Sequence, residues 1–202
     1  MADQLAQLNN EMAEIIERVR YSLVRITNSE HSAGAGTIWH SDGLIITNAH
    51  VIQYPQVEVT LWDGRAFPGY LLARDPKHDL AAVSIDAHDL PAIELGKSKQ
   101  LRPGEWVMAL GHPWGVLGGV TAGVVIGVNA HWPEFSPNGQ EWVISSLHLR
   151  PGHSGGPLVN AQGQLVGINT MMNGPDVGIA IPVDIAKAFL REAMKKEAAA
   201  VS

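Results

Sequence analysis

Short apolar runs separated by turn-forming residues make up most of this chain. Turn signals such as Asp63-Gly64 and Gln162-Gly163 stand between runs rich in Val and Ile, a pattern typical of strands joined by tight connections. It predicts strands at 24–26, 36–39, 44–47, 57–61, 66–72 and 80–85, and then at 105–110, 120–128, 142–144, 157–159, 165–168 and 177–181. Many short strands at this spacing favour an all-β sandwich or barrel.

Two segments have instead the three- and four-residue apolar period of an amphipathic helix. The first covers residues 3–20, with apolar positions at Leu5, Leu8, Met12, Ile15, Ile16 and Val19. The second is expected over 183–198, directly after Pro182, with Asp184 as its N-cap. The sequence therefore predicts one helix before the strands and one after them.

Length and composition fit a single domain with a sizeable core, because the 202 residues are 46% apolar and 17% charged. A faint echo suggests two related barrels, over about 21–98 and about 103–182. Gly34-Ala35-Gly36-Thr37-Ile38 and the hairpin after it parallel Ser154-Gly155-Gly156-Pro157-Leu158 and its hairpin. Chance similarity between two hairpins explains the echo nearly as well.

Charge and cysteine content exclude several classes of function. There are 14 Lys and Arg against 20 Asp and Glu, a net charge of −6, and no run of like charges, which disfavours nucleic acid as a partner. The absence of cysteine excludes a thiol nucleophile and disulfides. No HExxH or CxxC motif indicates a metal site, and we expect no cofactor.

The segment Met1-Ala2-Asp3-Gln4 lacks the pattern of a secretory signal. We therefore expect a protein that stays where it is made or one from which a targeting segment has been removed.

A glycine-spaced stretch offers a different reading. From Trp106 to Pro133 there is no charged side chain other than histidine, and Gly115, Gly119, Gly123 and Gly127 have the spacing of a self-associating membrane helix. Pro113, however, interrupts the stretch, and its apolar runs are β-branched. We therefore expect two strands joined by a loop and no membrane span, with a membrane-inserted interaction module as the alternative.

Three motifs, each weak alone, supply the parts of a nucleophilic site. His50 closes the run Thr47-Asn48-Ala49-His50-Val51, Asp79 opens the apolar run that follows it, and Ser154 lies in the turn Pro151-Gly152-His153-Ser154-Gly155-Gly156. The order His, Asp, Ser is the order found in chymotrypsin. Together they predict a Ser-His-Asp catalytic triad.

The residue types fit distinct roles in acyl transfer. His50 would take the proton of the Ser154 hydroxyl and return it to the leaving amine, and Asp79 would hold the other ring nitrogen of His50. The backbone N–H groups of Gly152 and Ser154, with a contribution from the peptide of His153, would form the oxyanion hole.

Further motifs resemble those of a known family over roughly residues 10–195 and appear in order with the triad motifs. They are Leu110-Gly111-His112-Pro113-Trp114-Gly115, Gly167-Ile168-Asn169-Thr170 and Ala180-Ile181-Pro182. Together these blocks resemble the trypsin-like serine proteases of the HtrA (Deg) family.

The resemblance implies two six-stranded antiparallel β-barrels of the chymotrypsin/trypsin type, with N- and C-terminal helices and the active site between the barrels. It also implies ATP-independent quality control, by cleavage of unfolded or damaged polypeptides in the cell envelope or periplasm, and frequently a homotrimer. A complete chain without a signal would instead be cytoplasmic.

Some positions depart from the family pattern. Members usually carry PDZ domains after the protease domain, and no such sequence follows here, so we expect it to be absent or truncated. The family typically has Asn where this chain has His153, and Ile-Asn-Pro-Gly where it has Leu149-Arg150-Pro151-Gly152. By position, Leu149, Ile168 and Met172 would line the primary specificity pocket, which predicts cleavage after Val, Ala or Leu.

Two other functions remain open on the same motifs. A catalytically silent peptide-binding or scaffold protein would keep the fold and lose the chemistry, and the altered approach to Ser154 keeps this alternative open. An esterase would use the same triad, but the sequence of an α/β-hydrolase nucleophile elbow is missing.

Overall fold

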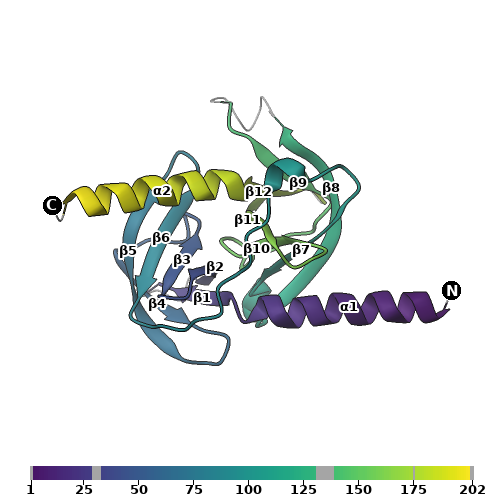
Figure 1. Ribbon diagram of the computed structural model, residues 1–202, viewed down its shortest axis with the longest axis horizontal. Helices are drawn as coiled ribbons and strands as arrows, with labels where there is room; N and C mark the ends of the chain where they lie inside the picture. Colours follow the sequence, from purple (N-terminus) through teal and green to yellow (C-terminus); the bar gives the residue numbers. More distant parts are fainter. Residues whose placement is uncertain (1, 29–32, 131–138, 175, 201–202) are drawn as a thin grey trace.

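The computed structural model describes residues 2–28, 33–130, 139–174 and 176–200. Within them, the strands form two closed antiparallel barrels of six strands each (Figure 1). The first consists of β1 (Leu23–Thr27), β2 (Ala33–His40), β3 (Leu44–Thr47), β4 (Gln56–Thr60), β5 (Ala66–Asp75) and β6 (Leu80–Ile85). The second consists of β7 (Trp106–Gly111), β8 (Gly119–Ala130), β9 (Trp142–Ser145), β10 (Pro157–Asn160), β11 (Leu165–Met172) and β12 (Gly178–Pro182). The predicted fold class is confirmed, and each predicted strand is present with small shifts at its ends.

The two barrels share one strand order. Neighbours run β1-β2-β3-β6-β5-β4 in the first and β7-β8-β9-β12-β11-β10 in the second, and the pairs β1·β4 and β7·β10 close them. The sequence echo lies on β2–β3 and on β10–β11, which hold different places in this order. The echo therefore does not follow the structural correspondence between the barrels.

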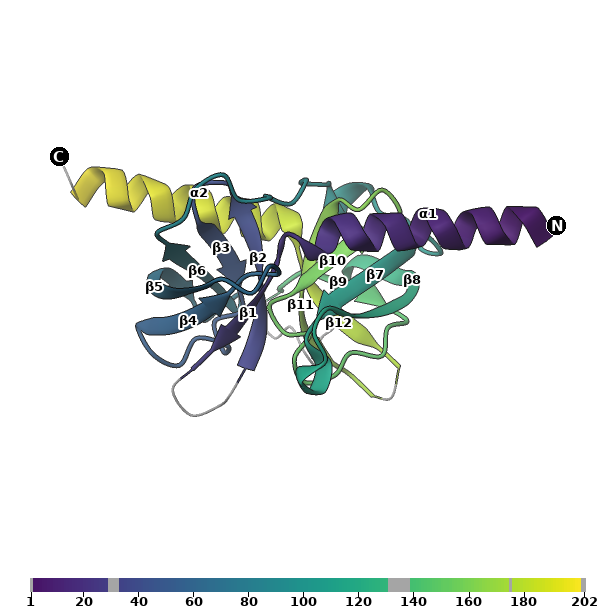
Figure 2. The ribbon, with the colours of Figure 1, turned by 90° about the horizontal axis from the view of Figure 1, so that it is seen from below.

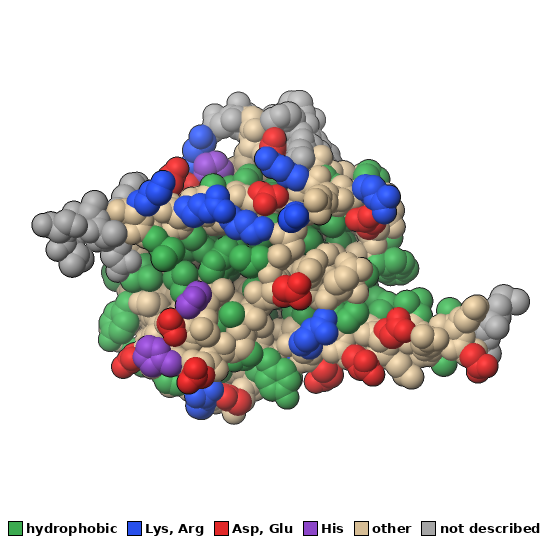
Figure 3. Space-filling view, viewed as in Figure 1, with side chains coloured by type: hydrophobic (Ala, Val, Ile, Leu, Met, Phe, Trp, Pro, Cys, Tyr) green, Lys and Arg blue, Asp and Glu red, His purple; other side chains and the backbone are tan. Residues whose placement is uncertain are grey.

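Each terminal helix crosses to the barrel at the other end of the chain. Helix α1 (Ala2–Arg20) precedes the first barrel but lies along the second, where Arg18 donates a 2.7 Å hydrogen bond to the carbonyl of Gln162 (Figures 1 and 2). Helix α2 (Val183–Ala200) follows the second barrel and lies over the first, where Leu190 and Met194 line a cavity with Leu44 and Leu72. The helices thus tie the barrels together. Lys and Arg side chains follow α2 and acidic side chains follow α1 on the face shown in Figure 3.

Helix α2 begins one residue before the expected N-cap. Asp184 is inside its first turn, so the prediction of Asp184 as N-cap is wrong. Its carboxylate accepts a 2.8 Å hydrogen bond from the hydroxyl of Ser98, in the short helix η1 (Ser98–Gln100). The Ser98 Oγ in turn accepts the N–H of Asp184 at 3.4 Å. The Ser98 side chain, remote in sequence, therefore accepts an N–H in the first turn of α2 that the side chain of a local N-cap would otherwise accept.

Three groups of buried side chains hold the barrels. One lies within the first barrel and one within the second. The third joins Leu23, Ile46 and Leu80 of the first barrel to Met108 and Leu110 of the second, with Val19 of α1 and Leu190 of α2. Burying each such side chain contributes about 1.5–3 kcal/mol, so the junction between the barrels is itself a core.

The stretch without Asp, Glu, Lys or Arg forms β7 and β8 with the short helix η2 (Pro113–Gly115) between them, as expected; its last residues, 131–133, lie outside the described residues. Over the described parts of the chain, neither helix is apolar enough along its length to span a membrane.

Candidate active site

Antiparallel pairing of β3 with β6 brings His50 and Asp79 together. Thr47 at the end of β3 pairs with Ala81 near the start of β6, so the residues just after one strand meet those just before the other. Ser154 comes from the second barrel, directly before β10, and its carbonyl accepts a 2.9 Å hydrogen bond from the N–H of Ala35 on β2. The three predicted triad residues therefore converge where the barrels meet.

The Asp79 carboxylate holds His50 through three contacts. The Nδ1 of His50 is 2.8 Å from Oδ2 and 3.0 Å from Oδ1, and the His50 N–H donates to Oδ1 at 3.0 Å. The backbone of Asp79 has φ +55°, in the left-handed region that Asp tolerates better than most residues. Its carbonyl accepts hydrogen bonds from the side chain of Asn48 and the N–H of Ala49. The imidazole is thereby fixed with Nε2 as its unbound nitrogen.

Thr170 also belongs to this site, although the sequence motifs assign it no role. Its hydroxyl donates a 2.6 Å hydrogen bond to Oδ2 of Asp79, across the two barrels. Burial raises the pKa of Asp79, but the hydrogen bonds from His50 and Thr170 outweigh it and hold the pKa below its usual value. Asp79 is therefore an anion at neutral pH. Thr170 lies 91 positions from Asp79, so no local pattern could have paired them.

The hydroxyl of Ser154 points at a neighbouring carbonyl in this structure. It donates to the Thr170 carbonyl at 3.1 Å and makes no hydrogen bond to His50. Ser154, His50 and Gly152 nevertheless line the same cavity, of about 200 Å³. A rotation about the Cα–Cβ bond of Ser154 changes the direction of its hydroxyl without moving the backbone.

The turn before Ser154 leaves two backbone donors unused. In the described part of the chain, the N–H groups of Gly152 and Ser154 donate to no acceptor, whereas the N–H of His153 donates to the Arg150 carbonyl at 3.0 Å. Gly152 has φ +104°, and a Cβ on it would lie 2.3 Å from the His112 carbonyl oxygen, so only glycine fits. The N–H of His112 donates to the Gly152 carbonyl at 2.8 Å and holds the turn.

Two buried histidines lie behind this turn. The Nδ1 of His153 is 3.0 Å from the Arg150 N–H, and the Nδ1 of His112 accepts the N–H of Gly118 at 3.3 Å. Burial lowers the pKa of both imidazoles, and that of His112 to about 4. Both rings are therefore neutral at pH 7.

A cavity of about 420 Å³ opens beside Ser154. It is lined by Leu149, Arg150, Pro151, His153, Ser154, Thr170, Met171 and Met172. Leu149 and Met172, two of the three residues predicted for the specificity pocket, are among them. Ile168 is fully buried in the core between the barrels and is not among the lining residues. The register of β11 against β12 shifts between Asn169 and Met171, and this irregularity breaks the alternation that would put Ile168 on the same face as Met172.

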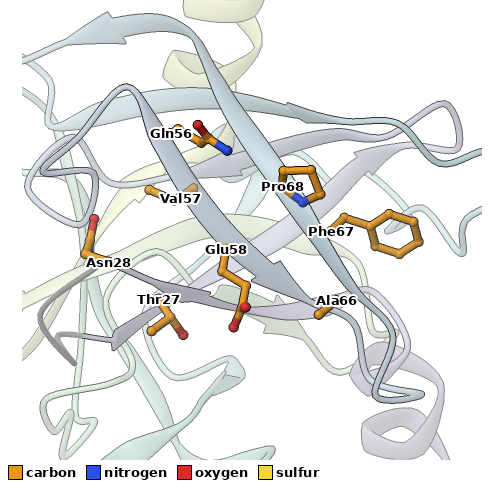
Figure 4. Close-up of a pocket in the computed structure, with 8 residues that line it drawn as sticks. All are labelled: Thr27, Asn28, Gln56, Val57, Glu58, Ala66, Phe67 and Pro68. Carbon is orange, nitrogen blue, oxygen red and sulfur yellow. The ribbon is translucent and has the colours of Figure 1, made fainter.

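A larger cavity lies away from these residues. It has about 560 Å³ and lies over β1, β4 and β5 of the first barrel (Figure 4). Among the described residues of its lining, Glu58 is the one titratable side chain, and none of the three predicted triad residues is among them. Within the described residues, no three His, Cys, Asp or Glu side chains are arranged to hold a metal ion.

Comparison with known proteins agrees with this geometry. The family described as trypsin-like peptidase domain matches residues 34–168. The mitochondrial serine protease HTRA2 of Drosophila willistoni is 39% identical over 170 residues, which cover 82% of this chain and 39% of the relative. The putative serine protease HhoB of Synechocystis is 37% identical over 163 residues, which cover 78% and 39%.

Solved structures of an HtrA-type protease share the fold. The structure of AlgW with a tripeptide aligns with a TM-score of 0.85 and 32% identity, covering 92% of this chain and 64% of that one. The structure of AlgW with a decapeptide aligns with a TM-score of 0.82 and 27% identity, covering 91% and 67%. The chain thus spans about two fifths of the length of the curated relatives it matches.

Proposed function

Because this chain belongs to the family of trypsin-like peptidase domains, we propose that it is a serine endopeptidase with His50, Asp79 and Ser154 as its catalytic triad. The observation that carries the proposal is the contact of both Asp79 oxygens with Nδ1 of His50, at 2.8 and 3.0 Å, in a cavity that Ser154 also lines. This contact leaves Nε2 as the base.

The reaction begins when the Ser154 hydroxyl leaves the Thr170 carbonyl and turns toward Nε2 of His50. As Oγ bonds to the substrate carbonyl carbon, its proton passes to Nε2, and Asp79 stabilises the imidazolium without taking the proton. The oxygen of the substrate carbonyl becomes negative and accepts hydrogen bonds from the free N–H groups of Gly152 and Ser154. Losing one such donor typically costs about a hundred- to a thousandfold in rate.

The intermediate then breaks the peptide C–N bond. His50 gives its proton to the leaving amine, and the acyl group stays on Ser154 as an ester. A water molecule attacks this ester while His50 takes its proton. As the C–O bond to Ser154 breaks and the acid leaves, His50 gives that proton to Oγ, which restores the serine and the neutral imidazole. The N–H of His153 is bound to Arg150, so Gly152 and Ser154 are the donors we assign to the oxyanion.

The lining of the 420 Å³ cavity suggests the substrates. Leu149 and Met172 give it apolar walls, which fits Val, Ala or Leu before the scissile bond. The structures of the HtrA-type protease AlgW with a tripeptide and with a decapeptide support a polypeptide as the class of substrate. By the same relationship we propose ATP-independent cleavage of unfolded polypeptides in quality control and a homotrimeric assembly. A cleavage profile dominated by Lys, Arg or Phe at this position would contradict the specificity.

Cleavage of casein by the wild type and by Ser154→Ala tests the activity. We expect casein fragments from the wild type and none from the variant, while the midpoints of thermal unfolding of the two proteins should be nearly equal. Intact casein with both proteins would instead favour the silent peptide-binding alternative. Binding of a labelled casein peptide without turnover would then identify that function.

A further inference from the structure

Arg150 belongs to the lining of the proposed substrate pocket and contacts an exposed tryptophan. Arg150 is among the residues that line the 420 Å³ cavity, and the next residue, Pro151, lines both this cavity and the one shared by His50 and Ser154. The guanidinium carbon of Arg150 lies 5.3 Å from the ring centroid of Trp114, within the range of a cation–π contact. Trp114 is 72% exposed. Arg150 therefore contacts an exposed Trp114 and lines the same cavity as Ser154.

Among the described residues, this guanidinium has no carboxylate partner. In the described residues Arg20, Arg65 and Arg102 each form an ion pair with a nearby acid, and Arg150 forms none. Asp79 is already bound by His50 and Thr170, and Asp176 by His148 at 2.7 Å. Arg150 thus carries an uncompensated positive charge in a chain with a net charge of −6.

Backbone hydrogen bonds fix the pair in place. The N–H of Trp114 donates to the Pro151 carbonyl at 3.2 Å, and the N–H of His112 donates to the Gly152 carbonyl at 2.8 Å. Trp114 has φ +51°, so its turn holds an uncommon conformation. Stacking uses the face of the guanidinium and leaves its N–H edges free to donate. A cation held this way loses little conformational freedom when an anion binds.

We propose that Arg150, held against Trp114, determines substrate specificity by binding the carboxylate of an Asp or Glu side chain close to the scissile bond. The preferred substrate then combines an aliphatic side chain in the pocket with an acidic one beside it. This inference rests on the proposed endopeptidase function. The HtrA pattern typically has Asn at this position, so the guanidinium belongs to this chain rather than to the shared machinery.

Matched peptides test the inference. Each carries Val before the scissile bond and Ala, Glu or Lys at one position at a time, from the third residue before the bond to the third after it. At low ionic strength, Glu at one or two positions should raise kcat/KM about three- to tenfold over Ala, the size expected for a partly exposed charged pair, and Lys should lower it. The advantage should shrink in about 0.5 M salt.

Two substitutions assign the effect to this side chain. Arg150→Gln should remove the preference for Glu, and Arg150→Glu should reverse it in favour of Lys. Arg191→Gln and Arg191→Glu make the same changes of net charge on the exposed surface of α2 and should keep the wild-type preference. Equal kcat/KM for Glu and Ala peptides at every position, or a preference that survives in Arg150→Glu, would overturn the inference.

The inference and the proposed function fail in different ways. If the wild type cleaves the Ala peptides with no preference for Glu, the specificity claim alone is wrong. If it cleaves neither these peptides nor casein, the endopeptidase proposal is wrong. Fluorescence anisotropy with the labelled Glu and Ala peptides and the Ser154→Ala protein then decides the carboxylate claim by binding. Tighter binding of the Glu peptide, lost in Ser154→Ala/Arg150→Gln, supports the claim, and equal binding rejects it.

Discussion

The imidazole Nδ1 of His153 faces both backbone groups of Arg150, at 3.0 Å from its N–H and 3.2 Å from its carbonyl oxygen. The carbonyl already accepts the N–H of His153, so a neutral ring with its proton on Nε2 satisfies the remaining donor. A proton on Nδ1 would leave the Arg150 N–H without an acceptor. The neutral side chain of His153 therefore supports the turn that presents Gly152 and Ser154.

His153→Asn should keep this support, because the Asn side-chain oxygen can also accept the Arg150 N–H. We expect kcat at pH 7.5 within about threefold of the wild type, and a loss of about ten- to a hundredfold for His153→Leu, which has no acceptor. The pH profile separates support from packing. Burial lowers the pKa of His153, so on acidification below that pKa the wild type should lose activity more steeply than His153→Asn, which has no imidazole at this position. Superimposable profiles would refute a role for the protonation state of His153.

Buried His112 should make folding stability depend on pH. Burial lowers its pKa from 6.5 to about 4, and the nearby charges of Arg25 and of His153 when protonated act in the same direction. Between these pH values the unfolded chain binds a proton that the folded chain does not, so the free energy of unfolding falls as the pH falls from about 6.5 to about 4. The loss is up to about 3 kcal/mol.

Urea unfolding at pH 7 and pH 5 checks this prediction against His112→Asn. The Asn oxygen can accept the Gly118 N–H in place of Nδ1 but does not titrate, so the variant should lose less stability between the two pH values. An equal loss in both proteins would show that other groups account for the acid sensitivity.

Gly155 should tolerate no side chain. It has φ +82°, and a Cβ would lie 2.2 Å from both the Ala35 carbonyl oxygen and the Thr47 hydroxyl. Gly155→Ala should lower the free energy of unfolding by about 3 kcal/mol or more. Gly64 has a similar φ of +89° with nothing within 4 Å, so Gly64→Ala should cost only the backbone strain, about 1–2 kcal/mol. Equal urea midpoints for the two variants would mean that crowding at Gly155 has no effect.

Thr170→Val should weaken catalysis by removing the 2.6 Å hydrogen bond to Asp79. With one donor fewer, Asp79 holds the His50 imidazolium less firmly, and we expect kcat to fall about tenfold, the equivalent of about 1.4 kcal/mol. Thr170→Ser keeps the hydroxyl and should recover most of the rate. Failure of the Ser variant to exceed the Val variant would assign the effect to packing instead of to the hydrogen bond.

Much of the fold could be read from local pattern. Strand β3 is a β-branched run and the turn at Asp63-Gly64 needs φ > 0, so their own residues specify them. The motifs around His50 and Ser154 are also local, and they carried the triad prediction. Asp79 opens an apolar strand between them, which is also a local pattern.

The rest depended on contacts between distant segments. The hydrogen bonds of Thr170 to Asp79 and of Ser98 to Asp184 join residues far apart in the chain, and periodicity says nothing about such pairs. The core position of Ile168 follows from the local register shift in β11, which alternation alone cannot predict. The direction of the Ser154 hydroxyl is a side-chain rotamer, set by the Thr170 carbonyl that the fold brings to it.

Labelling with a fluorophosphonate, followed by peptide mass mapping, tests the assignment of Ser154, His50 and Asp79 as a catalytic triad. We expect one phosphonyl group per chain, on Ser154, with labelling lost in Ser154→Ala and slowed at least a hundredfold in His50→Ala, which lacks the base. Labelling spread over other serines, or a rate at Ser154 that does not change in His50→Ala, would contradict the triad assignment.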